Sequence, residues 1–302
     1  MQAINDNTLF HTEAANSLRL PLNFPQTFLP ERRLLAALLE FAQGSGVGDK
    51  ETISAATGIP TGRSTGKVVP LIHYGLGMGL LTAAREGSQW QLELTTLGAQ
   101  VRREDPYLSE PVTQWLLHLM LCRRADLGQP ASGVADAWFL LLAEGPLLFG
   151  REFRVAAFHQ ALAQRHGGLG YLKGLSTLVP RMYTESACFG DAGVLLPVIG
   201  EEGAFVRASA PCDGSFYPAY ALSLWQQWDV LFGDHTQISF DEFDRATRWS
   251  ALLGWGPEAR SDWLQWLVGQ GWLQLDRYTG SPVLLRLIDS ERLTASLYSG
   301  LV

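Results

Sequence analysis

The sequence has 302 residues, of which 47% are hydrophobic and 18% are charged. This composition excludes a disordered or fibrous chain, and the length allows two or three small domains that each bury a core. The three cysteines form no Cys-x-x-Cys pair, which excludes a disulfide framework and a cysteine-built zinc site. A net charge of −7 disfavours nucleic-acid binding by the whole surface.

No membrane span or export signal is expected. The longest apolar runs, such as residues 138–143, are far shorter than the roughly 18 residues that a membrane helix needs. The first residues lack a basic stretch followed by an apolar one. We therefore expect a cytoplasmic protein.

The first part of the chain, residues 1–108, predicts a helix, a short helix, a third helix and a hairpin. Leucines at helical spacing predict the first helix over residues 31–43, and Asp49 is placed to cap the second. The third helix is expected from Lys67, where Pro70 predicts a late start or a kink. Period-two alternation over residues 89–95 predicts a strand. This order is typical of a winged helix-turn-helix.

The middle part, residues 109–233, begins with strong helical patterns and then becomes irregular. Residues 112–122 predict a helix with one apolar side, and residues 135–143 predict a buried segment. His118 is expected in the core as a hydrogen-bonding residue. From residue 188 to residue 220 short apolar runs with Gly and Pro predict loops or a small strand pair.

The last part, residues 234–302, repeats the plan of the first. Ser239 and Glu242 form a capping box, and Pro257 opens a further helix. Residues 269–273 resemble residues 77–81, and both stretches lead from a helix into a strand. The prediction is a mainly α protein with small β wings, of the α+β class, in which two winged-helix-like modules flank a helical middle.

One segment is locally basic although the protein is acidic. From Thr52 to Arg85 there is no Asp or Glu. In a helix-turn-helix, the start of the recognition helix and its surroundings meet base edges and phosphates. We therefore predict DNA contacts from six side chains of this segment: Arg63, Ser64, Thr65, Lys67, His73 and Arg85.

Other chemistry finds no support in the residue patterns. Residues 62–67 resemble a phosphate-binding loop, but three residues separate the glycines instead of four, and Val68 follows Lys67. The six histidines show no metal-ligand spacing, so no metal site is predicted. No lysine follows a carboxylate by two residues, as one common nuclease centre requires. Catalytic residues stay unassigned.

Three stretches together resemble a known family. They are Gly66-Lys-Val-Val-Pro-Leu-Ile-His-Tyr74, Asp105-Pro-Tyr-Leu108 and Trp115-Leu-Leu-His-Leu119. Their order is similar to that in the SspB family of bacterial single-strand DNA phosphorothioation systems. The similarity covers residues 23–144, and Gly75 departs from it because an aromatic residue is expected there.

The resemblance implies a DNA-binding and DNA-nicking component of an antiviral defence system. It implies double-stranded DNA, a cysteine desulfurase, a sulfur-transfer enzyme and an ATPase as partners, and a divalent metal as cofactor of the nicking reaction. Two alternatives stay open. The ten tryptophans could anchor protein partners on a non-enzymatic winged-helix scaffold, or the protein could be a transcriptional regulator.

Overall fold

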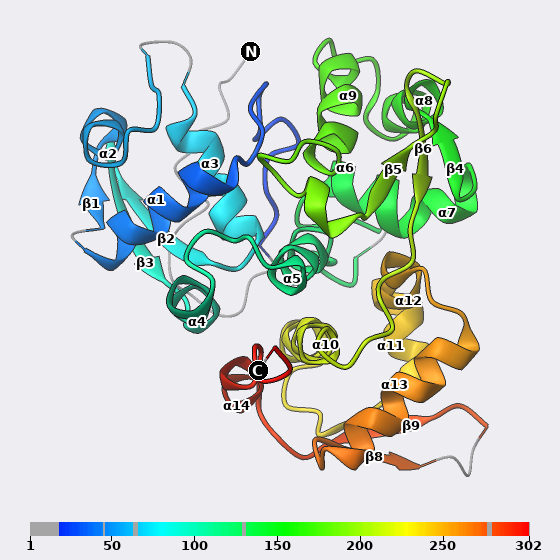
Figure 1. Cartoon of the computed structure of the whole chain (residues 1–302). Coiled ribbons are helices and arrows are strands. Elements are labelled where there is room, and N and C mark those ends of the chain that lie inside the picture. Colours follow the sequence, from blue (N-terminus) through cyan, green and yellow to red (C-terminus); the bar gives the residue numbers. More distant parts are fainter. Residues whose placement is uncertain (1–17, 45, 63–65, 129–130, 277–279, 302) are drawn as a thin grey trace.

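A computed structural model describes residues 18–44, 46–62, 66–128, 131–276 and 280–301. Within these ranges the chain forms three antiparallel sheets of three strands each, with helices around and between them (Figure 1). The α+β class expected from the sequence is confirmed. The division into domains at residues 108 and 233 stays a prediction, and we use N-terminal, middle and C-terminal unit for these three parts.

The N-terminal unit contains the predicted order of elements. It consists of α1 (Arg32–Gln43), β1 (Val47–Gly48), α2 (Lys50–Thr57), α3 (Val68–Gly77), β2 (Leu81–Glu86), β3 (Gln89–Leu94) and α4 (Thr96–Glu104). Both β1 and β2 pair antiparallel with β3. The two-residue strand β1 is absent from the sequence prediction, because a segment so short has no readable periodicity.

The predicted local signals act as expected in this unit. The Asp49 carboxylate accepts a hydrogen bond from the Thr52 N–H at 2.8 Å and caps α2. Helix α3 begins at Val68 and is not delayed by Pro70. Pro70 lies in the first helical turn, where backbone N–H groups have no partner within the helix, so its missing N–H costs no hydrogen bond.

The middle unit is less purely helical than predicted. Its elements are α5 (Pro111–Leu121), α6 (Asp136–Phe139), the π-helical η2 (Leu140–Glu144), α7 (Gly145–Leu148), β4 (Glu152–Arg154), α8 (Val155–His166), α9 (Leu172–Met182), the 3-10 helix η3 (Gly190–Ala192), β5 (Leu195–Pro197) and β6 (Ala204–Arg207). The strand pair expected after residue 188 is formed by β5 and β6, and β4 joins it as a third strand.

Helix α5 has no solvent-facing side. The spacing predicts one apolar face, yet every residue from Val112 to Leu121 is buried. The reason is its position, since α3, η3 and α10 (Tyr217–Phe232) all pack against it. In Figure 1 it lies between the N-terminal unit and the middle unit, directly above α10.

The C-terminal unit follows α10 and again ends in a hairpin. Its elements are β7 (Gln237–Ser239), α11 (Phe240–Thr247), α12 (Trp249–Leu253), α13 (Pro257–Gly269), β8 (Leu273–Asp276), β9 (Val283–Arg286) and α14 (Ser290–Ala295). The Ser239 hydroxyl accepts a hydrogen bond from the Glu242 N–H at 3.4 Å, as the capping box requires. Gly79 and Gly271 both adopt positive φ at the point where a helix ends and a strand follows. This agrees with the sequence similarity between residues 77–81 and residues 269–273.

The same connectivity occurs in all three sheets. Each begins with one strand, continues through helices and ends with an antiparallel hairpin whose last strand lies in the middle of the sheet. Eight of the ten tryptophans are buried. They fill the cores of the units, and their number therefore gives no support to the idea that they are surface anchors for partners.

Candidate nucleic-acid interface

The structure describes half of the six predicted DNA contacts. Arg63, Ser64 and Thr65 lie outside the described residues. The residues on either side of them come together, because Thr61 and Gly66 form an antiparallel bridge and the Lys67 N–H donates to the Pro60 carbonyl at 2.8 Å. Of the predicted polar entry to α3, only Lys67 therefore belongs to the described residues.

Lys67 is compensated by an acid from elsewhere in the chain. Its ammonium group forms an ion pair with the Glu31 carboxylate, which immediately precedes α1. The two side chains are 26% and 32% exposed, so the pair is partly shielded from solvent. The acid-free stretch from residue 52 to residue 85 is thus not acid-free in space. Lys67 adds little positive potential for a phosphate to meet.

His73 and Arg85 lie together. They line a cavity of about 240 Å³ beside α3 and the hairpin of β2 and β3. Arg19, Asn23 and Trp90 line the same cavity. The segment that precedes α1, starting at residue 18, forms one wall of it. Because these residues come from three separate parts of the sequence, only the fold assembles them.

Aromatic rings hold the side chains of Arg85 and His73 in place within the cavity. The Arg85 guanidinium carbon lies 5.1 Å from the centre of the Trp90 ring, and Arg85 Nε donates to the Gly87 carbonyl at 3.0 Å. The His73 ring lies edge-on to Phe24 and to Trp90, with ring centres 6.2 and 6.3 Å apart. A cation stacked on an indole is held in place without a carboxylate.

The cavity is a positive and hydrogen-bonding environment. Within the described part of the chain, neither Arg19 nor Arg85 has a carboxylate within ion-pair distance. The Asn23 Oδ1 atom is buried and has no hydrogen-bond partner among these residues. A guanidinium stacked on an aromatic ring without a neighbouring carboxylate, as at Arg85, suits the phosphates and bases of nucleic acid.

The negative charge of the protein is concentrated outside the N-terminal unit. Residues 1–108 contain nine Lys and Arg against ten Asp and Glu, a net charge of −1. The rest of the chain, with 14 Lys and Arg against 20 Asp and Glu, has a net charge of −6. Because exposed charges are screened beyond about 10 Å at moderate salt, a polyanion near this unit meets mainly the local charge.

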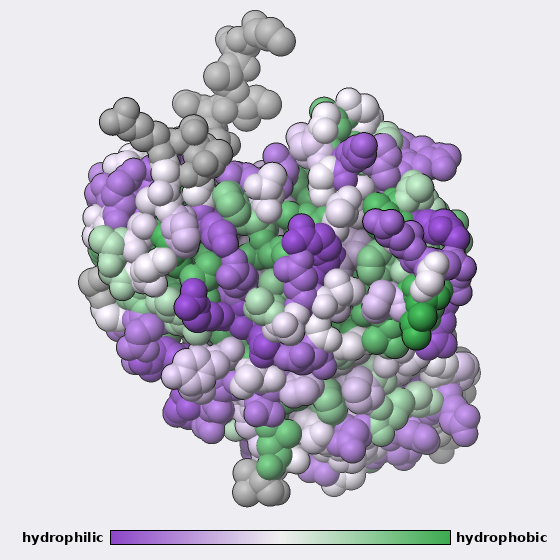
Figure 2. Space-filling view, turned by 45° about the horizontal axis from the view of Figure 1, so that its top comes forward, coloured by the Kyte–Doolittle hydropathy of each residue, from purple (hydrophilic) through white to green (hydrophobic). Residues whose placement is uncertain are grey.

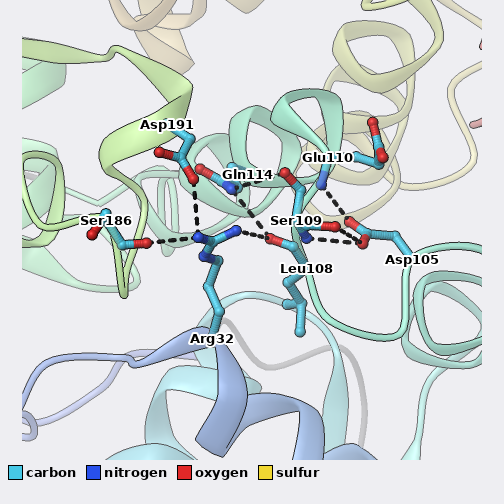
Figure 3. A network of polar contacts seen from close by, with 8 residues as sticks. All are labelled: Arg32, Asp105, Leu108, Ser109, Glu110, Gln114, Ser186 and Asp191. Atoms are coloured by element: carbon cyan, nitrogen blue, oxygen red, sulfur yellow. Dashed lines mark hydrogen bonds and ion pairs between the residues drawn. The ribbon is translucent and has the colours of Figure 1, made fainter.

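The Asp-Pro-Tyr-Leu stretch joins the N-terminal and middle units (Figure 3). The Asp105 carboxylate accepts hydrogen bonds from the Ser109 and Glu110 N–H groups at 2.8 and 3.0 Å and fixes the turn before α5. The Leu108 carbonyl, at the end of the turn, accepts from Gln114 Nε2 at 3.2 Å and from Arg32 Nη1 at 3.4 Å.

Arg32 completes this connection from the side of α1. Its Nη2 atom donates to the Ser186 carbonyl at 2.6 Å and lies 2.9 Å from an Asp191 carboxylate oxygen. Figure 3 shows the guanidinium between the loop of Ser186 and Asp191 and the turn at Leu108. The network therefore positions the N-terminal unit against the middle unit.

The Trp-Leu-Leu-His stretch also makes internal contacts. Trp115 Nε1 donates to the Ala192 carbonyl at 2.9 Å, and His118 Nδ1 lies 2.8 Å from the Tyr183 hydroxyl oxygen. Burial lowers the pKa of His118 from 6.5 to about 3, so the ring is neutral at physiological pH. The prediction that His118 is a hydrogen-bonding core residue is confirmed.

The described residues contain no group of three or more His, Cys, Asp or Glu side chains arranged to hold a metal ion. Over the same residues, no helix has the length and apolar character that crossing a bilayer demands.

These observations define a protein of three helix-and-hairpin units arranged around a buried central helix. Neither a family model nor a curated protein matches the sequence. Among solved structures, a magnesium-bound crystal structure of SspB matches with a TM-score of 0.72 at 15% identity, covering 95% of this chain and 90% of that chain. A second crystal structure of SspB matches with a TM-score of 0.69 at the same identity and coverage. The chain has the SspB fold, and the resemblance drawn from the three stretches is confirmed at this level.

Sequence reasoning missed Arg19, Asn23 and Trp90 as members of the cavity. The period-two alternation of residues 89–95 was a signal that Trp90 faces the inside of the protein. Arg19 and Asn23 have no periodic context, and their place depends on the Leu20 N–H, which donates to the Val134 carbonyl at 2.9 Å and ties the segment to the middle unit. Such a long-range contact has no signal in a single sequence.

Proposed function

We propose that the protein is a DNA-binding component of a phosphorothioation system, and that it binds DNA through its N-terminal unit. The observation that carries the proposal is the cavity lined by Arg19, His73, Arg85 and Trp90, where the Arg85 guanidinium stacks on the Trp90 ring. The shared fold with SspB supports the assignment to such a system. On this proposal its partners are double-stranded DNA and the cysteine desulfurase, sulfur-transfer enzyme and ATPase of the system.

The interpretation of the N-terminal unit as a winged helix supports the same surface. Its sheet has the order β1-β3-β2, with α2 and α3 between the first strand and the hairpin. In such a module the third helix enters a groove and the hairpin lies along the backbone. Eight of the ten residues of α3 are buried, so this helix does not enter a groove here. A phosphate bound by Arg85 would instead place the duplex against the hairpin and the mouth of the cavity, where His73 is partly exposed.

The test is duplex binding by the full chain at several salt concentrations. We expect Arg19→Ala together with Arg85→Ala to weaken binding about tenfold or more near 100 mM salt. The slope of log K against log salt should fall by about two, because each lost phosphate contact removes about 0.9 from it. Lys67→Ala should have a smaller effect, since Glu31 already neutralises the ammonium group.

The matched control is Arg102→Ala. Arg102 belongs to the same unit but is paired with Glu40, with Nε 2.9 Å from a carboxylate oxygen. Its loss should leave the affinity and the salt slope unchanged. Equal behaviour of the double variant and of this control would rule out the cavity as the DNA-binding surface.

DNA nicking is a further part of the proposal, and it derives from the family resemblance. Supercoiled plasmid incubated with the protein and Mg²⁺ should yield open circles, and the Arg19 and Arg85 double variant should slow their appearance. Plasmid that stays supercoiled, alongside intact duplex binding, would restrict the function to binding.

A second candidate is a scaffold that recruits partner proteins through the middle unit. Exposed apolar side chains gather there, and their exposed fractions are 73% for Leu147, 58% for Leu148, 51% for Leu196 and 99% for Ile199. On the face drawn in Figure 2, the green colour is densest at the edge formed by this unit. Stable co-purification with a partner, together with no duplex binding at low salt, would favour this function.

A further inference from the structure

A second cavity of about 240 Å³ adjoins the candidate DNA interface on the side of the middle unit. Arg19 lines this cavity and also the cavity of His73 and Arg85. The other residues of its wall come from the loop before α6 and from the end of α8: Asp126, Gly128, Ala131, Ser132, Arg165 and His166. Arg19 therefore connects the two cavities.

His166, the last residue of α8, is paired with a buried carboxylate at the start of α6. Its Nε2 atom lies 2.8 Å from Asp136 Oδ2. The Asp136 side chain is 3% exposed, and its Oδ1 atom accepts a hydrogen bond from the Gly133 N–H at 3.1 Å. A carboxylate only accepts hydrogen bonds, so the neutral ring holds its proton on Nε2. This leaves the lone pair of Nδ1 able to take up a proton.

Nδ1 is the accessible atom of the pair. It has no hydrogen-bond partner within the described part of the chain, and it is not one of the buried atoms. The His166 side chain is 15% exposed, and its ring lines the cavity. A molecule in the cavity can therefore reach Nδ1 while the contact with Asp136 stays intact.

The charges around the pair stabilise a protonated ring. Arg165 pairs through Nε with Asp136 at 3.1 Å and through Nη1 with Glu144. Two carboxylates thus face one guanidinium, and this group has a net charge of −1 until the ring gains a proton. The nearby loop adds Asp126 and Arg124, whose charges are opposite in sign. A buried carboxylate beside an imidazole fixes its tautomer and stabilises the imidazolium that forms during proton transfer.

We propose that His166 is the general base of phosphodiester hydrolysis by this protein and that Asp136 positions it. The proposal rests on the proposed DNA-binding and nicking function. Arg19 is exposed and has no carboxylate within ion-pair distance among the described residues, so it is available to a backbone phosphate at the edge of the cavity.

In this reaction His166 Nδ1 takes a proton from a water molecule as the water oxygen attacks phosphorus. The bond between phosphorus and the leaving sugar oxygen breaks, and that oxygen takes a proton from solvent. The imidazolium then returns its proton to solvent. A positioned general base typically contributes a factor of about 10² to 10⁴ to the rate.

The test is nicking of supercoiled plasmid by the full chain with Mg²⁺, together with duplex binding. His166→Gln keeps a donor for Asp136 but has no base, so nicking should fall at least about a hundredfold at unchanged duplex affinity. The logarithm of the wild-type rate should rise by about one per pH unit on the acidic limb, because only the neutral ring accepts a proton. This limb should be absent in His166→Gln.

Asp136→Asn tests the positioning role. An amide can donate to Nε2 and so move the ring proton to Nδ1, which should slow nicking at least about tenfold. The acidic limb of the rate should also shift to lower pH, because the imidazolium loses its charged partner. A purely structural role of Asp136 would leave the position of this limb unchanged.

The matched control is His159→Gln, since His159 belongs to the same helix but not to the wall of the cavity. It should bind and nick like the wild type. Equal nicking by His166→Gln and His159→Gln would overturn the proposal and leave the nicking function standing. A wild-type protein that binds duplex but does not nick would overturn both. Loss of duplex binding together with nicking in His166→Gln would place His166 in the binding surface and also overturn its role as the base.

Discussion

Replacing Arg32 with alanine should lower the free energy of unfolding by about 3 kcal/mol. The hydrogen bond to the Ser186 carbonyl at 2.6 Å is short and charge-assisted, and such a bond contributes about 2 kcal/mol. The bond to the Leu108 carbonyl at 3.4 Å is long and adds well under about 1 kcal/mol. Asp191 is 50% exposed, so its ion pair adds only about 0.5 kcal/mol.

The assay is urea unfolding followed by tryptophan fluorescence and by circular dichroism. Arg102→Ala is the comparison, because Arg102 also pairs with a carboxylate, but that of Glu40 is 70% exposed. This variant should lose less than about 1 kcal/mol. If both variants lose the same amount, Arg32 is an ordinary surface residue, and the reasoning that it joins the N-terminal and middle units fails.

Two further predictions concern the core. The unfolded chain should bind a proton on His118 near pH 6.5 and the folded chain only near pH 3, so stability falls by up to about 1.4 kcal/mol per pH unit as the pH drops between these values. Urea unfolding from pH 7 to pH 5 should show a shallower decline in His118→Gln, and parallel curves would contradict this. Gly98→Ala should cost about 3 kcal/mol or more in thermal or urea unfolding, because a Cβ there would lie 1.9 Å from the Leu80 carbonyl oxygen. Gly174→Ala, which meets nothing within 4 Å in a helix, should instead gain about 0.5–1 kcal/mol, and similar effects of the two substitutions would contradict the packing at Gly98.

Local signals in the sequence predicted much of the fold. The caps at Asp49 and Ser239 mark true helix starts, because a side-chain oxygen and a free backbone N–H lie within a few residues of each other. Strands β1 and β4, of two and three residues, could not be found. They exist because β3 and β6 offer them backbone partners, and such pairing depends on residues far along the chain.

The candidate interface was only partly predictable for the same reason. The choice of Arg85 and His73 rested on a local absence of acids, and the fold does bring them to one cavity. The same argument overlooked Glu31, which the fold places beside Lys67. Charge counted along a segment therefore differs from charge at a surface, since an ion pair can form between residues 36 positions apart.

The stretches that carry the family resemblance and the residues that carry the proposed chemistry are largely different sets. Leu108 and Trp115 contact partners inside the protein, and these contacts hold the units together. A pattern of internal contacts is tied to a fold, which is consistent with an SspB fold at only 15% identity. The same pattern of internal contacts does not by itself indicate DNA binding. The motif residues are therefore poor targets for testing function, because their loss would disturb the arrangement of the units. Arg19 and Arg85 are exposed, so we expect the fold to tolerate their replacement.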